Sequence, residues 1–167
     1  IALYGDNNAF QQALGADSRK LTVVPNGVDV DRFSTLPDRV SDRPTLAFIG
    51  RITPIKDIQT FIDVAERVAS KVADFRAFVI GPMDEDPDYA QSCIDAVNER
   101  GLDHIITFTG PVDVRDYMAE IDVLMLTSIS EALPLVILEA GAAGVPCIAT
   151  DVGACREILG CPGSPGQ

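Results

Sequence analysis

The stretch that decides the fold is residues 45–72, which read TLAFIGRITPIKDIQTFIDVAERVASKV. Its first five residues form an apolar run that is typical of a buried strand. After the loop of residues 50–56, apolar side chains return at helical spacing, at Ile58, Phe61, Ile62, Ala65, Val68, Ala69 and Val72. The stretch therefore predicts a strand followed by an amphipathic helix over residues 57–72, the repeating unit of a parallel α/β sheet.

The same alternation continues along the chain. It predicts further strands over residues 76–80, 105–109, 123–127 and 146–150. It also predicts a helix from Pro87 to just before Gly101, one that carries Val114, Tyr117, Met118 and Ile121, and one that opens at Pro134. The pattern indicates an α/β fold, a Rossmann-like parallel sheet with helices on both faces.

The pattern divides the chain into three segments. Residues 45–159 form the α/β domain, and an apolar content of 47% is enough for one substantial core. Residues 1–44 lack the alternation, so we expect an entrance segment and interdomain portion there, with a short helical piece. Residues 160–167 are rich in glycine and proline, and we expect them to form a poorly ordered tail.

The composition excludes several classes of protein. The net charge of −12 and the lack of a basic cluster argue against binding to nucleic acid or to anionic lipid. Every long apolar run is broken before it reaches membrane-spanning length, so a soluble, cytoplasmic protein is expected. The cysteines at positions 93, 147, 155 and 161 are scattered, and the single histidine, His104, is interpreted as structural, so no metal site is predicted.

Two common nucleotide-binding motifs are also missing. No GxGxxG follows any predicted strand, which disfavours a nicotinamide or flavin oxidoreductase, and there is no Walker A motif. Asp84 and Asp86 form an Asp-x-Asp, but they lie in a proline-flanked loop that is better explained as a solvated turn. Any anionic ligand must therefore be held by some other arrangement.

The helix that opens at Pro134 is unusual. Residues 130–141 read SEALPLVILEAG, an almost wholly apolar run with Glu131 before the helix and Glu139 within it. A buried charge is costly, so both carboxylates need partners. Leu133, at the expected cap position, has no side-chain oxygen, so the first amides of the helix make an anion site. Alternatively, water satisfies these amides and the glutamates pair with nearby arginines.

Two cations are expected close to that helix. Arg51 and Lys56 share the loop after the first strand, and ligands of open parallel sheets bind where the strands end. Two cations and a helix start would together hold a pyrophosphate. Glu131 and Glu139 would then accept hydrogen bonds from hydroxyl groups on either side of it, as in a sugar nucleotide. The alternative is that both cations lie on the surface and pair with Asp57 or with residues 84–86.

These residues resemble the retaining glycosyltransferases of family 4, which have the GT-B fold of two Rossmann-like domains and use nucleotide-sugar donors. Residues 20–159 are similar to the carboxyl-terminal, donor-binding domain, one half of that fold. Three motifs carry the resemblance: Gly50-Arg51 with Lys56, the E-x7-E motif from Glu131 to Glu139, and Pro25-Asn26-Gly27-Val28-Asp29 with Phe33, which is similar to PNG(I/V)D...F.

The resemblance implies a role for each phosphate-binding group. Gly50, Arg51 and Lys56 would form the pyrophosphate site, and the amides of Leu135 and Val136 would meet the distal phosphate. Arg51 and Lys56 would neutralise the leaving diphosphate in place of the metal ion that other transferases use. No metal and no cofactor is therefore expected, and the nucleotide sugar is the substrate.

The resemblance also implies roles for the carboxylates. Glu131 would contact the hydroxyls of the donor hexose and Glu139 the ribose. The base would lie near residues 110–113, where Val112 stands, and would be held largely by backbone groups. Glu131 thus joins the two cations as a candidate catalytic residue. One departure is Ala132, because many relatives have glycine there, and its methyl group restricts a positive φ.

A narrower resemblance concerns residues 54–58, 81–87 and 152–157. They are similar to the glycosyltransferases of bacterial Pel exopolysaccharide assembly, which implies a UDP-hexose such as UDP-glucose and a polysaccharide synthase complex as a partner. The family's amino-terminal domain supplies the site for a glycan or lipid-linked acceptor. That domain is not among these residues, so we expect the fragment alone to be inactive.

Two other functions stay open. A GT-B-fold sugar-nucleotide epimerase would also grip a diphosphate, although the combination of E-x7-E with PNG(I/V)D favours transfer. A non-catalytic phosphate-binding α/β module would show no preference for nucleotide sugars over phosphate.

Overall fold

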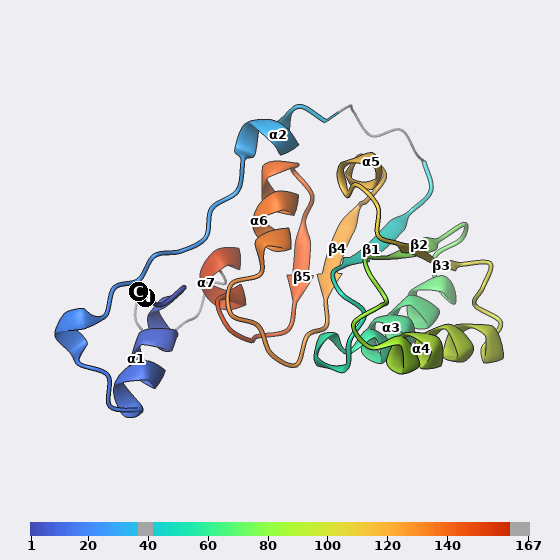
Figure 1. Ribbon diagram of the computed structural model, residues 1–167. Coiled ribbons are helices and arrows are strands. Elements are labelled where there is room, and N and C mark those ends of the chain that lie inside the picture. Colours follow the sequence, from blue (N-terminus) through green and yellow to red (C-terminus); the bar gives the residue numbers. More distant parts are fainter. Residues whose placement is uncertain (37–41, 161–167) are drawn as a thin grey trace.

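The sheet has five parallel strands in the order β3-β2-β1-β4-β5 (Figure 1). The structure is a computed structural model that describes residues 1–36 and 42–160 of the chain. The strands are β1 (Thr45–Ile49), β2 (Arg76–Ile80), β3 (Ile106–Gly110), β4 (Val123–Leu126) and β5 (Cys147–Ala149). The predicted parallel α/β sheet is confirmed.

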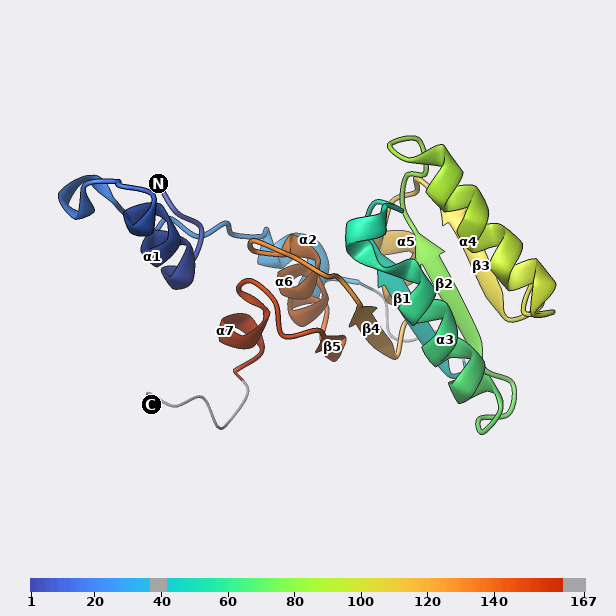
Figure 2. The same cartoon turned by 90° about the horizontal axis from the view of Figure 1, so that it is seen from below.

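Helices cover both faces of this sheet. The first face packs against α3 (Ile58–Ala69) and α4 (Pro87–Glu99), and the second against α2 (Val30–Ser34), α5 (Arg115–Met118) and α6 (Leu135–Ala142). Helix α7 (Cys155–Leu159) follows β5, and α1 (Gly5–Ala13) stands apart from the sheet in both views (Figure 1, Figure 2). Two short 3₁₀ turns complete the elements, at Ser18–Lys20 and Pro54–Lys56.

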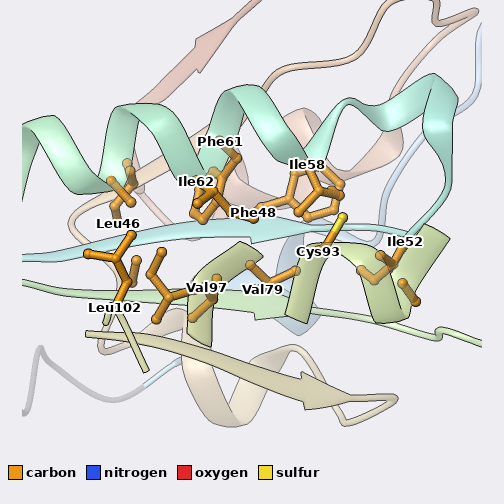
Figure 3. Packing of buried hydrophobic residues seen from close by; sticks show 14 of the residues in the cluster. Leu46, Phe48, Ile52, Ile58, Phe61, Ile62, Val79, Cys93, Val97 and Leu102 are labelled. Carbon is orange, nitrogen blue, oxygen red and sulfur yellow. The ribbon is translucent and has the colours of Figure 1, made fainter. Parts of the chain in front are cut away.

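The alternation of side chains along β1 builds two cores. Leu46 and Phe48 face α3 and α4, whereas Ala47 and Ile49 face the helices of the other side. Figure 3 shows side chains of α3 packing onto Phe48, and the rings of Phe48 and Phe61 meet edge to face at 6.1 Å between centroids. All five residues of β1 are buried, as expected for the central strand of a doubly covered sheet.

The chain reverses its winding direction beside β1. From β1 it runs through α3, β2 and α4 to β3, which extends the sheet to one side. It then returns through α5 to β4, which pairs with the other side of β1, and continues to β5. The loops that follow β1 and β4 therefore lie side by side at the carboxyl edge of the sheet, at the switch in winding direction, which is where open α/β sheets bind ligands.

Several predicted boundaries were wrong by a few residues. Helix α3 begins at Ile58 because Asp57 caps it, and it ends at Ala69 rather than at residue 72 because the chain turns there. Strand β3 runs from Ile106 to Gly110, one residue later at both ends than predicted. Pro134 is the N-cap of α6, in extended conformation, and not its first helical residue.

Helix α2 was not predicted. Asp29 caps it by accepting a hydrogen bond from the N–H of Arg32, and Phe33 is buried in the core shared with α6. In the PNG(I/V)D...F motif, the aspartate thus caps α2 and the phenylalanine packs that helix onto the sheet domain. The proposed division into three segments stays a prediction, and residues 161–167 of the expected tail lie outside the described residues.

Over residues 1–36 and 42–160, no helix has both the length and the apolar character needed to cross a bilayer.

The two-core packing predicts a clear difference between two isoleucines. Ile62 of α3 is fully buried, so Ile62→Ala should lower the free energy of unfolding by about 2–5 kcal/mol through lost contacts and a cavity. Ile148 on the edge strand β5 is half exposed, so Ile148→Ala should cost about 1 kcal/mol or less. Urea unfolding of both variants is the measurement, and equal losses would contradict the assignment of the core.

Candidate functional site

The loops that follow β1 and β4 interlock at the carboxyl edge of the sheet. The N–H of Ile129 donates to the carbonyl of Ile55 at 2.8 Å. The hydroxyl of Thr127 donates to the carbonyls of Lys56 and Asp57, at 3.0 and 2.9 Å. These bonds fix the backbone of Lys56 against the end of β4.

Lys56 and Glu131 form an ion pair across the two loops. Nζ of Lys56 lies 2.5 Å from Oε1 of Glu131, and their side chains are only 16% and 9% exposed. The hydroxyl of Ser128, which is buried, donates to the same Oε1 at 2.6 Å. Two of the predicted site residues are thus brought together, and the partner of Glu131 is a lysine rather than the arginine of the alternative interpretation.

The loop of residues 150–154 supports Glu131 from the other side. The hydroxyl of Thr150 donates to the carbonyl of Ser128 at 2.6 Å, and the N–H of Ala154 donates to the carbonyl of Ala132 at 2.9 Å. Within the described ranges, the only non-glycine residues with positive φ are Asp57 and Asp74. Ala132 therefore fits its loop without left-handed backbone, and the difficulty expected for its methyl group does not arise.

Helix α6 opens without a side-chain cap. Pro134 offers no side-chain hydrogen bond, and no acceptor among the described residues outside the helix meets the N–H of Leu135 or Val136. A continuous apolar run is typical of a helix that is buried on most sides, but in α6 only Ile137 and Ala140 are buried, and Leu135 is 41% exposed. The helix packs chiefly against α2 and leaves its start open.

Glu139 lies half-buried on α6. Burial raises the pKa of its carboxyl, and the positive charge of Arg32 on α2 partly opposes that rise. No lysine or arginine of the described chain comes within 4.0 Å of it. Glu139 is therefore a carboxylate that the fold partly desolvates without neutralising.

Arg51 lies on the surface and pairs with an acidic residue, which is the alternative to a preformed pyrophosphate site. Its guanidinium pairs with Glu85 in the loop after β2, and both side chains are half exposed, at 55% and 50%. Its neighbour Gly50 lies tightly against Gly81, where an added Cβ would come within 2.0 Å of the Gly50 carbonyl oxygen. The loops after β1 and β2 are therefore joined by close backbone packing and by an exposed ion pair.

The loop after β3 also lies at the carboxyl edge of the sheet, next to the loop after β2. The N–H of Gly81 donates to the carbonyl of Gly110 at 3.1 Å, which places residues 110–113 beside the β2 loop. Val112 is exposed there, as a residue that contacts a base would be. Arg115 hydrogen-bonds the carboxylate of Asp113 and lowers its pKa to about 2.

Sequence reasoning missed the residues that hold this site together. Thr127, Ser128 and Thr150 all place hydroxyl groups between the loops at this edge. The sequence pattern that could have indicated Thr127 and Ser128 is the presence of two adjacent hydroxyl residues directly after an apolar strand. In the described residues no group of three or more His, Cys, Asp or Glu side chains is arranged to hold a metal, and the thiols of Cys93, Cys147 and Cys155 are unpaired.

A family model described as glycosyl transferases group 1 matches residues 43–165. The chain belongs to the glycosyltransferase group 1 family. It is 30% identical to a D-inositol 3-phosphate glycosyltransferase of Kineococcus radiotolerans, over 87% of this chain and 37% of that protein. It is 32% identical to a 2-deoxystreptamine glucosyltransferase of Streptomyces kanamyceticus, over 88% of this chain and 41% of that protein. The chain thus spans well under half the length of these relatives.

Solved structures share the fold of this group 1 domain. Alr3699/HepE of Anabaena, solved with UDP and glucose, superposes with a TM-score of 0.83 at 23% identity, over 94% of this chain and 45% of that one. The carboxyl-terminal domain of LpcC from Francisella tularensis superposes with a TM-score of 0.70 at 29% identity, over 78% and 74%. The Rossmann-like sheet predicted from sequence therefore matches that of GT-B glycosyltransferases.

The shielded position of Glu131 predicts a large effect of removing its cation. Lys56→Met should lower the free energy of unfolding by about 3 kcal/mol, because it leaves a buried carboxylate without a partner. Adding Glu131→Gln should recover much of that loss. Arg51→Met, which opens the exposed pair with Glu85, should cost about 1 kcal/mol or less and serves as the control. Urea unfolding of the wild type and these three variants is the measurement. Equal losses of stability in Lys56→Met and Arg51→Met would refute the distinction between a shielded and an exposed ion pair.

Glu139 predicts a pH-dependent difference in stability. Because its pKa is raised in the folded state, the native protein binds its proton more tightly and loses stability as the pH rises past the ordinary glutamate range. Glu139→Gln lacks this loss. It should match the wild type at about pH 4 and be more stable at about pH 7. The exposed Glu99→Gln is the control in urea unfolding, and a Glu139→Gln curve parallel to wild type would show that the carboxylate is not desolvated.

Proposed function

We propose that this domain binds the donor in a retaining glycosyltransferase that transfers a hexose from a UDP-sugar to a glycan or lipid-linked acceptor. The observation that carries the proposal is the shielded Lys56–Glu131 pair, which joins the loops after β1 and β4 at the carboxyl edge of the sheet. An ammonium group and a carboxylate held there suit a ligand that has both phosphates and hydroxyls. Membership of the glycosyltransferase group 1 family supports the same class of ligand.

The positive charge for the diphosphate comes from the chain itself. Lys56 gives one contact to Glu131 and has further N–H donors for a phosphate oxygen. The uncapped amides of Leu135 and Val136 add the positive end of the α6 dipole. Arg51 reaches the ligand by leaving Glu85, which costs little because that pair is half exposed. We propose that these groups serve where other transferases use a metal ion.

The two carboxylates recognise different parts of the donor. Both hydrogen bonds to Glu131 from the described residues go to Oε1, which leaves Oε2 to accept from a hexose hydroxyl. Glu139, just over one turn into α6 and without an ion-pair partner in the described chain, accepts from the ribose. The loop that carries Gly110 and Val112 meets the base. Gly50 lets the β1 loop approach the diphosphate through backbone groups.

The transfer step places negative charge where these cations stand. When the bond between the anomeric carbon and the diphosphate oxygen breaks, its electron pair stays on the leaving oxygen. The anomeric carbon forms its new bond to the oxygen of an acceptor hydroxyl, whose proton passes to the leaving diphosphate. Lys56, Arg51 and the start of α6 stabilise that charge, which is why Lys56 and Arg51 join Glu131 as the proposed catalytic residues. Preorganised donors of this kind need no rearrangement at the moment of reaction.

The acceptor and the cellular setting are further parts of the proposal. The Pel-type resemblance of residues 54–58, 81–87 and 152–157 supports exopolysaccharide synthesis in the cytoplasm, in contact with a polysaccharide synthase complex. Relatives act on acceptors as different as D-inositol 3-phosphate and 2-deoxystreptamine, according to their names. The acceptor is therefore set by parts of the protein other than the Lys56 edge.

Calorimetry with UDP-glucose, UDP and inorganic phosphate tests the proposal on the chain of 167 residues. UDP-glucose and UDP should bind far more tightly than phosphate. Lys56→Met should weaken both nucleotides by about tenfold to a hundredfold, because one charge-assisted hydrogen bond contributes about 1.5–3 kcal/mol. Glu139→Gln should weaken UDP itself, and Glu131→Gln mainly UDP-glucose. The exposed Glu99→Gln should change none of these affinities.

Two results would overturn parts of this proposal. Equal, weak binding of all three ligands would instead support a simple phosphate-binding module. Equal loss of UDP in Glu131→Gln and Glu139→Gln would contradict the separate roles of the two carboxylates. With the full-length protein, donor turnover in the absence of any acceptor would favour a sugar-nucleotide epimerase.

A further inference from the structure

Gly153 lies in van der Waals contact with the peptide that carries Glu131. Its φ of +56° is in the left-handed region. A Cβ added at this position would come within 2.2 Å of the carbonyl oxygen of Glu131 and 2.7 Å of the carbonyl oxygen of Ala132. Both are backbone atoms, so they cannot swing aside as the end of a side chain would. Any side chain at position 153 must therefore push the Glu131 peptide and the loop of residues 150–154 apart.

Gly153 is part of a loop that holds the site carboxylate at three points. Residues 150–154 run from β5 to α7, and Thr150 and Ala154 donate hydrogen bonds to the carbonyls of Ser128 and Ala132. Gly153 fills the space between those two bonds. Beside it, buried Cys155 has its thiol pKa raised, first by burial and then by the charge of Glu131, which is consistent with this closeness.

We propose that Gly153, with the loop of residues 150–154, is a positioning element that aims Glu131 at Lys56 and at the donor sugar. The part of this inference that concerns the donor sugar rests on the proposed function, whereas the part that concerns the Lys56–Glu131 pair does not. The two hydrogen bonds that Glu131 accepts from the described residues both end on one oxygen, so a displaced peptide would turn that oxygen away from Lys56 and Ser128. The other oxygen would then no longer face the hexose.

The chain supplies a matched control for the backbone cost. Gly160 has a φ of +59°, close to that of Gly153, and no atom of the described residues lies within 4 Å of the Cβ that alanine would add. Gly160→Ala therefore introduces the backbone strain of a left-handed alanine, but its Cβ collides with no described atom. A difference between Gly153→Ala and Gly160→Ala isolates the contact with the Glu131 peptide.

The first measurement needs no ligand. Urea unfolding of Lys56→Met, Glu131→Gln and the double variant gives the coupling between the two side chains. In the Gly153→Ala background that coupling should fall to half or less of its wild-type value, and in the Gly160→Ala background it should be unchanged. An undiminished coupling in Gly153→Ala would overturn the inference whatever the protein binds.

The second measurement uses UDP-glucose and UDP in calorimetry. Gly153→Ala should weaken UDP-glucose by about tenfold or more and UDP less, and it should cost nothing further in the Glu131→Gln background. Wild-type affinity in Gly153→Ala would refute the positioning role and leave the proposed function intact. Failure of the wild type to bind either nucleotide would instead refute the proposed function, while the urea coupling still decides the geometry.

A second variant covers the case in which Gly153→Ala does not fold. Thr150→Val removes the hydroxyl that bonds the Ser128 carbonyl and adds no bulk. It should reduce the Lys56–Glu131 coupling and the affinity for UDP-glucose in the same direction as Gly153→Ala. Wild-type values for both quantities would overturn the positioning role of the loop.

Discussion

The ion pair between Lys56 and Glu131 is the interaction on which the rest of this edge depends. Two charges that are 16% and 9% exposed lose most of their hydration, and they are stable there because each is met by the other and the carboxylate also accepts a hydrogen bond from Ser128. Ser128 donates to the same carboxylate oxygen as Lys56, and Thr127 fixes the backbone of the lysine. The pair therefore requires the loops after β1 and β4 to keep one arrangement.

The topology of the sheet explains why this pair can form. β1 and β4 are neighbours in space, although the helices and strands between them belong to the other half of the sheet. Features that cost stability gather at the edge beside them: a shielded ion pair, an uncapped helix start and the half-buried carboxylate of Glu139. Such costs are expected where a structure is shaped for a ligand rather than for its own stability. The exposed pair of Arg51 and Glu85, by contrast, is screened by solvent and contributes little to stability.

Local pattern was enough to predict most of the fold and part of the site. The apolar runs located all five strands, and helical spacing located α3 and α4. Helix α2 was missed because it has five residues and is held by the distant packing of Phe33 against α6. Lys56, Glu131 and the bare start of α6 were predicted from residue type and position. Thr127 was not, because its role is a bond to a carbonyl 71 residues away, which no local pattern reveals.

A UDP titration followed by the backbone amide resonances of the chain would locate the ligand without any substitution. The amides of Lys56, Leu135, Val136 and Glu139 should shift together with one saturable affinity. The amides of Phe75 and His104, which precede β2 and β3 at the opposite edge of the sheet, should not move. Shifts confined to that opposite edge, or spread without saturation, would contradict a nucleotide site built around Lys56 and Glu131.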